Sequence, residues 1–467
     1  MKLLWQVEWL RFIRRTTNVC VLGVFTAVLT ASAIWSALEA REIRAEQAAQ
    51  RHEREETIRN AVVEVPEGAA LDAAAKQAFY LGRANSGIVG LTQLAALEGL
   101  ALGVSRFRQL STDIRVSVES RFADGRRSDN FINPALGGLG YLDLATVIVL
   151  FLPLAVIALG AGLVQEDRDS GVWRMVCAQT ITPWKSLFIA HAVRWATLTV
   201  ITVAISLIAI SVDPKGSLNA VVTWSVFVGV YCAWWVLLCA LTGLLRVSSG
   251  TTIMIALGGW LLLTLIVPGI LETTTARTSP APSRLASIVE MRAIQLLTEE
   301  DTPTLVNQWY ENHPGTRPVS IKEHTWPITF LPRFEAQDAQ LRPLMFRFEQ
   351  VQSLKEEQIT SYSWLSPALA LISAADYLAG VNAKRYEEYI NEVNTFELQW
   401  REFLTPKIMS YQGLAQHELR ELPVFAASPR LGESRNMATT SLVNLLLGVF
   451  IQVMLLFFIR RRFHVIN

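Results

Sequence analysis

The chain has 467 residues, of which 51% are hydrophobic and only 18% are charged. Together with a mean hydropathy of +0.31, this balance excludes an ordinary soluble protein. The formal net charge of +1 argues against a nucleic-acid partner and indicates no strongly charged ligand.

Residues 1–16 mix apolar side chains, such as Trp5 and Leu10, with basic ones such as Arg11. This pattern predicts an amphipathic helix in the membrane surface, with its tryptophans at headgroup depth. A secretory signal peptide cleaved after the Ala-Ser-Ala sequence at 31–33 is the competing interpretation. We expect the segment to be retained.

Six apolar runs of roughly 20 residues follow, long enough to cross a hydrocarbon layer of about 30 Å as α-helices. Arginines before the first run and after the last place both termini in the cytoplasm by the positive-inside rule. The fold class predicted is therefore an all-α polytopic membrane protein with six transmembrane helices and two mainly helical periplasmic insertions. The predicted divisions are an interfacial helix at 1–16, spans at 17–38, 141–164, 190–212, 220–245, 251–271 and 439–459, periplasmic segments at 39–140, 213–219 and 272–438, a cytoplasmic coupling segment at 165–189, a cytoplasmic turn at 246–250 and a cytoplasmic tail at 460–467.

Two further apolar stretches, at 88–104 and 365–378, contain Glu98 and Asp376. A carboxylate at the bilayer centre costs about 2.5 kcal/mol or more. Each stretch is therefore predicted to be a buried or interfacial helix of an external domain. Charged residues at helical spacing follow the first span, which predicts that its helix continues outward into solvent.

The chain contains no Gly-Lys pair and so no Walker A loop for ATP phosphates. Hydrolase and zinc-protease motifs are also missing, so we expect no catalytic, cofactor-binding or metal-binding residue and no enzymatic activity on this chain. Arg194 is expected to snorkel from the third span, and the four cysteines are expected to be small apolar fillers. A proton- or sodium-driven transporter would bury carboxylates near the midplane, so the energy source is expected to lie elsewhere.

The charged connector between the second and third spans carries a recognisable pattern. Its residues Asp167-Arg168-Asp169-Ser170-Gly171 resemble the acidic-Arg-acidic-x-Gly element that follows the second span in permeases of the ABC type-2 transporter family. That family continues with a leucine-rich helix and a proline. Here Trp173 and Arg174 stand at helix positions, Pro183 stands at the proline, and both acids are Asp where Glu is commoner.

Three other segments, at 94–103, 131–134 and 364–369, are similar to a subfamily of unknown function with large external insertions after spans one and five. The resemblance implies a half-transporter of the inner membrane of a Gram-negative bacterium. Two permease chains, like or related, would bind a cytoplasmic ATPase dimer that carries ATP and Mg. The lipid membrane is a further expected partner, and a periplasmic protein could bind the external domains.

An ATPase that closes on ATP must transmit its motion through a rigid feature held in a cleft. A short helix after a glycine turn is such a feature, and Asp167 and Asp169 near its N-terminus would complement its dipole. The candidate ATPase-coupling residues are Asp167, Arg168, Asp169, Ser170, Gly171, Trp173, Arg174 and Pro183.

The function expected is that of a permease subunit of an ATP-driven exporter with an amphiphilic cargo. One alternative is a mechanotransmission or envelope-assembly subunit, which would move periplasmic domains without carrying cargo. Another is a receptor or sensor without an ATPase, which would purify with no nucleotide-binding subunit.

Overall fold

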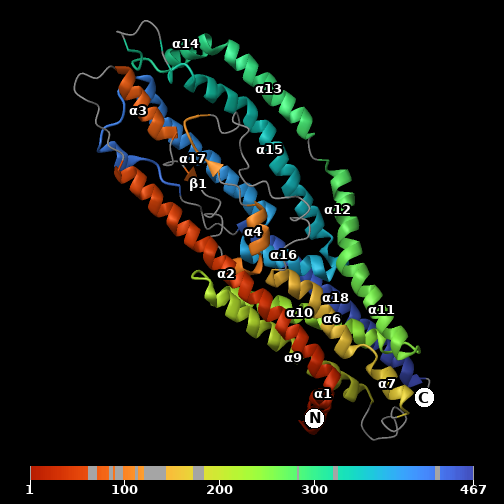
Figure 1. Ribbon diagram of the computed structural model, residues 1–467. Helices are drawn as coiled ribbons and strands as arrows, with labels where there is room; N and C mark the ends of the chain where they lie inside the picture. Colours follow the sequence, from red (N-terminus) through yellow and green to blue (C-terminus); the bar gives the residue numbers. More distant parts are fainter. Residues whose placement is uncertain are drawn as a thin grey trace.

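The computed structural model is elongated and almost entirely helical in the residues it describes (Figure 1). Both termini lie at one end, together with α1 (Lys2–Arg14) and α7 (Leu163–Asp169); we call this the terminal end. The opposite, distal end carries α3 (Leu71–Arg83) and α14 (Thr302–Asn312). The residues described are 2–60, 71–83, 88–89, 98–110, 114–119, 143–171, 183–280, 283–318, 324, 326–425 and 432–465.

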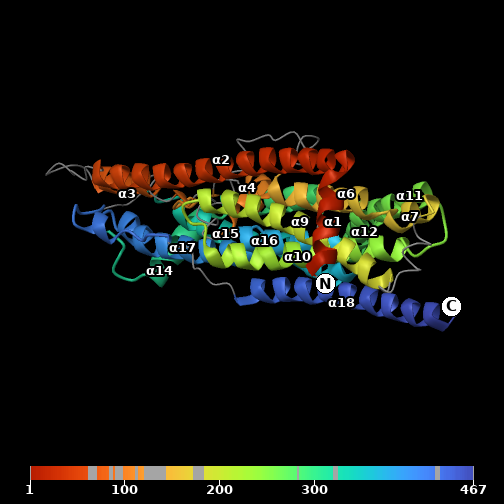
Figure 2. The same ribbon diagram turned by 90° about the horizontal axis from the view of Figure 1, so that it is seen from below.

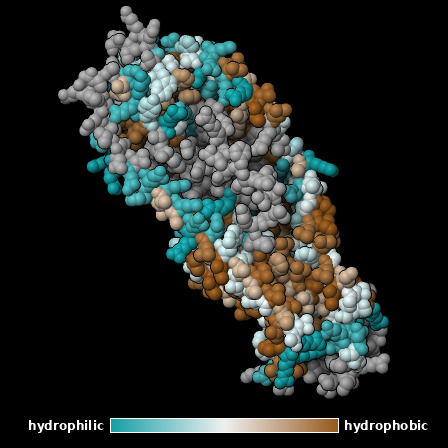
Figure 3. All heavy atoms as spheres, in the orientation of Figure 1, coloured by the Kyte–Doolittle hydropathy of each residue, from teal (hydrophilic) through white to brown (hydrophobic). Residues whose placement is uncertain are grey.

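Among the described residues, six helices are long and apolar enough to cross a membrane, which agrees with the number predicted. Hydrophobic atoms form a band across the lower half of the visible face, between more hydrophilic regions at both ends (Figure 3). That the terminal end faces the cytoplasm stays a prediction from the arginine pattern. The spans are built from α2 (Thr16–Asn60), α6 (Leu144–Gly160) with α7, α9 (Pro183–Val212), α10 (Leu218–Thr242), α11 (Ser249–Leu261) joined through the π-helix η4 (Leu262–Ile266) to α12 (Val267–Thr278), and α18 (Gly432–Val465).

Helices α6 and α10 form the centre of the bundle. The apolar window of the α6 span is 72% buried inside the chain, against 11% for the α11–α12 and α18 spans. Tyr231 of α10 is fully buried and donates a hydrogen bond from its hydroxyl to the Val149 carbonyl of α6 at 2.8 Å. A Cβ on Gly448 of α18 would lie 2.4 Å from Nε1 of Trp234, so glycine permits the close approach of α18 to α10.

Helix α2 is a single helix of 45 residues that extends well beyond the predicted end of the first span (Figure 2). The prediction that this helix continues beyond the first span is confirmed, and the side of the membrane on which it emerges stays a prediction. Its outer part is held by polar contacts: Arg108 of α4 (Val104–Leu110) donates to Glu39 at 2.6 Å and to Glu46 at 2.8 Å. The pKa of Arg108 is raised, because hydrogen bonds to the two carboxylates and their charges outweigh the lowering caused by burial.

The distal domain combines the two predicted insertions. The described part of the first contains α3, the antiparallel pair β1 (Ile88–Val89) and β2 (Ile114–Arg115), the turn η3 (Leu100–Leu102) and α4. The second contains α13 (Arg284–Glu300), α14, α15 (Leu331–Ser361), η5 (Ser363–Leu365), α16 (Pro367–Ala379), α17 (Ala383–Met409) and η6 (Glu418–Glu421).

The prediction of a helix at 88–104 is wrong for the residues that the structure describes. These residues form β1 and the short η3, and residues 90–97 are not among those described. Gly99 explains the interruption, because its N–H donates to the Leu378 carbonyl at 3.1 Å. A Cβ on Gly99 would lie 2.9 Å from that oxygen. The Gly99 N–H is thus hydrogen-bonded to α16 and not to a carbonyl within a helix of its own.

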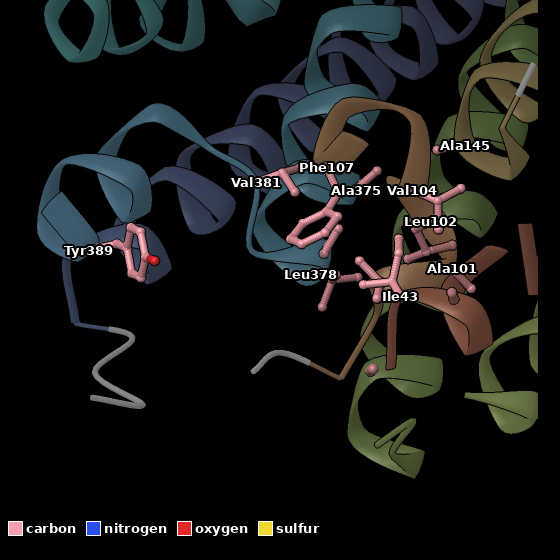
Figure 4. Close-up of a cluster of buried hydrophobic side chains, with 14 of the residues drawn as sticks. Ile43, Ala101, Leu102, Val104, Phe107, Ala145, Ala375, Leu378, Val381 and Tyr389 are labelled. Atoms are coloured by element: carbon pink, nitrogen blue, oxygen red, sulfur yellow. The ribbon is translucent and has the colours of Figure 1, made fainter. Parts of the chain in front are cut away.

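The buried helix predicted at 365–378 is confirmed as α16. Ser366 caps its N-terminus, and Gly380, with φ +74°, ends it. This helix lies against α18, α10 and α6, at the junction of the bundle and the distal domain. Phe107 there faces Leu378, and Ile43 of α2 packs beside Leu102 (Figure 4).

Candidate functional site

Helix α7 carries the first part of the predicted coupling element. Gly162, in the left-handed conformation with φ +84°, separates it from α6, and Ser170 and Gly171 follow its last turn. Asp167 and Asp169 lie in the last turn of α7, so they do not complement the dipole of α7 itself. That they complement the dipole of the helix predicted after Gly171 stays a prediction. The helix predicted after Gly171 lies in residues 172–182, which are outside the described residues.

Two ion pairs join α7 to α1 and to Arg15, the residue that follows α1. Arg11 contacts Asp167 at 2.5 Å and Arg15 contacts Glu166 at 2.6 Å; we call these four residues the α1–α7 clasp. Burial lowers the pKa of Arg11, but the hydrogen bond and charge of Asp167 outweigh it, so that the pKa is raised and the guanidinium stays charged. Figure 2 shows α1 crossing the direction of α2, α9 and α10, as expected for a helix in the membrane surface.

A second contact holds α7 to the turn between α10 and α11. The buried Gln165 donates from Nε2 to the carbonyls of Gly243 and Leu245 at 3.0 and 3.2 Å. Arg168 also donates to the Leu245 carbonyl, at 3.3 Å. These carbonyls follow the last residue of α10 and would otherwise lack helical partners, so α7 and this turn should move as one unit.

Arg194 of α9 secures the break between α6 and α7. It is only 4% exposed, which contradicts the prediction that it snorkels to the surface. Its guanidinium donates to the Leu159 carbonyl at 2.6 Å and to the Ala190 carbonyl at 2.7 Å, and it lies over the ring of Phe12 in α1. Carbonyls at a helix end need hydrogen-bond donors. The break after Gly160 leaves the Leu159 carbonyl at such an end inside the bundle, and Arg194 provides its donor.

The predicted coupling residues therefore have different environments. Asp167 is engaged in the clasp, whereas Asp169, Ser170 and Gly171 are exposed at the terminal end. Pro183 is the first residue of α9, so the third span's helix begins earlier than the predicted 190. Trp173 and Arg174 lie outside the described residues. In the part of the chain described, no three His, Cys, Asp or Glu side chains form a group that could hold a metal.

Replacing Gly162 with alanine should destabilise the protein by about 1–2 kcal/mol, because a left-handed conformation is costly for a residue with a Cβ. The new Cβ would also lie 2.7 Å from the hydroxyl oxygen of Ser249. Thermal unfolding in detergent measures the effect. Gly250→Ala is the matched control, since nothing lies within 4 Å of its Cβ position; equal stability of the two variants would contradict the prediction.

Residues 284–428 match a family model described as a domain of unknown function (DUF3526). The match covers the distal domain from α13 through η6. No curated protein and no solved structure matches the chain.

A second set of polar contacts, not predicted from the sequence, ties the matched domain to the spans. Ser366 donates from its hydroxyl to the Leu263 carbonyl at 2.6 Å, inside the π-helix η4 of the fifth span. Asn444 of α18 donates to the Ser363 hydroxyl at 2.8 Å. A π-helix leaves the ordinary helical bond pattern and often marks a functional position. The Ser-Pro pair at 366–367 signals a helix start, but not this partner.

Proposed function

We propose that this chain is the permease subunit of an ATP-driven ABC transporter, an exporter of the inner membrane, coupled to a separate cytoplasmic ATPase through the loop between its second and third spans. The observation that carries the proposal is the exposed turn Asp169–Gly171, held at the terminal end by the clasp and by Gln165. A rigidly held, exposed charged turn can transmit force to the spans, whereas a loose loop cannot.

The second permease chain, like or related, would cover the edge formed by α11, α12 and α13. Helix α13 exposes a stripe of large aliphatic side chains, and the polar residues 272–284 separate this stripe from the exposed apolar surface of α11 and α12. Outside the membrane, such a stripe favours a protein partner. A partner that follows the edge from span to distal domain must have both parts, as this chain does. The stripe consists of Leu285, Ile288, Val289, Leu296 and Leu297.

The test is the recovery of the ATPase with this chain, purified through a tag from its native membranes. Asp169→Ala should lower the ATPase recovered per permease by about tenfold, the effect of one lost contact of about 1.4 kcal/mol. Asp167→Ala should have a smaller effect, because its carboxylate binds Arg11. Asp301→Ala, at an exposed position of the distal domain, is the control.

If Asp169→Ala recovers as much ATPase as the wild type, Asp167 and Asp169 have a structural role only. Purification of the intact wild-type chain without any ATPase would reject the transporter proposal and favour a receptor or sensor.

The second candidate function is mechanotransmission. It is favoured by the contacts of Ser366 with η4 and of Asn444 with Ser363, which connect the fifth and sixth spans directly to the distal domain. The two functions differ in one measurement on the full complex in vesicles. Flux of an amphiphilic cargo with ATP hydrolysis supports the exporter, and hydrolysis that moves the distal domain without flux supports mechanotransmission.

A further inference from the structure

A groove of about 530 Å³ lies between α9, α10 and α18, within the membrane-spanning part of the chain. Its wall is apolar or aromatic except at Lys185 and His191. Small side chains on two of the helices make the room. They are Ala192 of α9 and Ala233 and Ala240 of α10.

The length of the groove indicates what fits into it. Its wall runs along α9 from Trp184 to Trp195, which is about 16 Å at a rise of 1.5 Å per residue. This is roughly half of a hydrocarbon core of about 30 Å, the depth of one leaflet. A transmembrane helix of a partner would need the full thickness, whereas an acyl chain needs one leaflet only.

Lys185 marks the headgroup end of the groove. It is exposed at the start of α9, beside Trp184, at the terminal end of the bundle. Lysine is a compact cation that binds phosphate as a point charge, and tryptophan is typical of the membrane interface. The groove therefore offers a cation at its mouth and apolar walls below it, which is complementary to an anionic lipid.

The polar atoms of His191 are not open to the groove. Its Nδ1 lies 3.0 Å from the Leu187 carbonyl and its Nε2 is fully buried, so the ring offers no polar contact to a ligand in the groove.

We propose that this groove binds one anionic amphiphile from the leaflet at the terminal end, with its phosphate at Lys185 and its acyl chain between α9, α10 and α18. The inference requires only that these helices span the membrane and does not rest on the transporter proposal. Its test accordingly needs no ATPase.

The experiment uses the full chain in nanodiscs with two photoactivatable lipid probes, anionic phosphatidylglycerol and zwitterionic phosphatidylcholine, each carrying a diazirine in its acyl chain. Cross-links should map to α9, α10 and α18. The wild type should capture the anionic probe about fivefold better, the effect of one charge contact of about 1 kcal/mol. Lys185→Gln should abolish this preference.

Ala233→Trp should fill the groove and lower capture of both probes by about tenfold or more. Val226→Trp, at a 47% exposed position of the same helix, is the control. Should Ala233→Trp unfold, Ala233→Leu provides a smaller obstruction. Capture that is equal in Ala233→Trp and Val226→Trp would identify annular lipid only and overturn the proposal. Equal capture of the two probes by the wild type would overturn it as well.

Discussion

Asp213→Asn should lower the free energy of unfolding by about 3–5 kcal/mol, the cost of breaking a buried ion pair from one side. Asp213 and Arg44 are 2% and 7% exposed, and they form two parallel hydrogen bonds of 3.0 and 3.1 Å. The pair fixes the outer half of α2 to the loop between α9 and α10. Asparagine can still accept the Lys215 N–H that Asp213 accepts at 3.1 Å, so the loss reports the charge.

Thermal unfolding of the purified chain in detergent measures this loss. Asp72→Asn is the matched control, because its pair with Lys76 is 33% and 40% exposed and should contribute at most about 1 kcal/mol. The double variant Arg44→Met with Asp213→Asn should recover most of the stability, since no charge is then buried at this position. If Asp213→Asn unfolds at the same temperature as the wild type, the ion pair does not stabilise the protein.

The membrane-spanning helices were predictable because their signal is local. Twenty consecutive apolar residues can be recognised without knowing any neighbour, and α16 follows from the Ser-Pro start and the carboxylate within it. The continuation of α2 beyond the first span was predictable for the same reason, since charged residues at helical spacing can be recognised in the sequence.

The contacts that organise the candidate site were not predictable because they are distant in the chain. Arg194 binds the Leu159 carbonyl 35 positions away, and Arg44 binds Asp213 169 positions away. Hydropathy treats both arginines as costly residues near a span, and only the packed bundle supplies their partners. The Gly-Ala-Gly sequence at 160–162 permits a break in the helix, but the need of this break for a hydrogen-bond donor cannot be read from the sequence.

Glu356 and Asp376 should make the stability of the distal domain depend on pH. Burial raises the pKa of Glu356 to about 7, and the charge of Asp376 adds to the rise; the Ala383 N–H and Arg106 oppose it. Burial likewise raises the pKa of Asp376 to about 6, with Arg106 opposing and Asp143 adding. Both carboxyl groups are thus easier to protonate in the folded protein than in the unfolded chain.

The sign of the effect follows from this difference. A carboxyl group with a raised folded pKa contributes stability below its unfolded value, here 4.5 for Glu356, and loses it as the pH rises through about 7. A shift of this size corresponds to about 3 kcal/mol at most. Glutamine stays neutral and can still accept the Ala383 N–H, so Glu356→Gln removes this loss.

Unfolding temperatures measured between about pH 4.5 and pH 8.5 should therefore diverge at the alkaline end, with Glu356→Gln the more stable protein by about 3 kcal/mol at most. The unfolding temperature of Glu356→Gln should still fall as the pH rises, but less steeply than that of the wild type, because Asp376 still titrates. Glu357→Gln makes the same chemical change at the adjacent exposed position and should follow the wild type throughout. If Glu356→Gln also runs parallel to the wild type, Glu356 is not buried in the charged form at alkaline pH, and its contact with Ala383 must open as the pH rises.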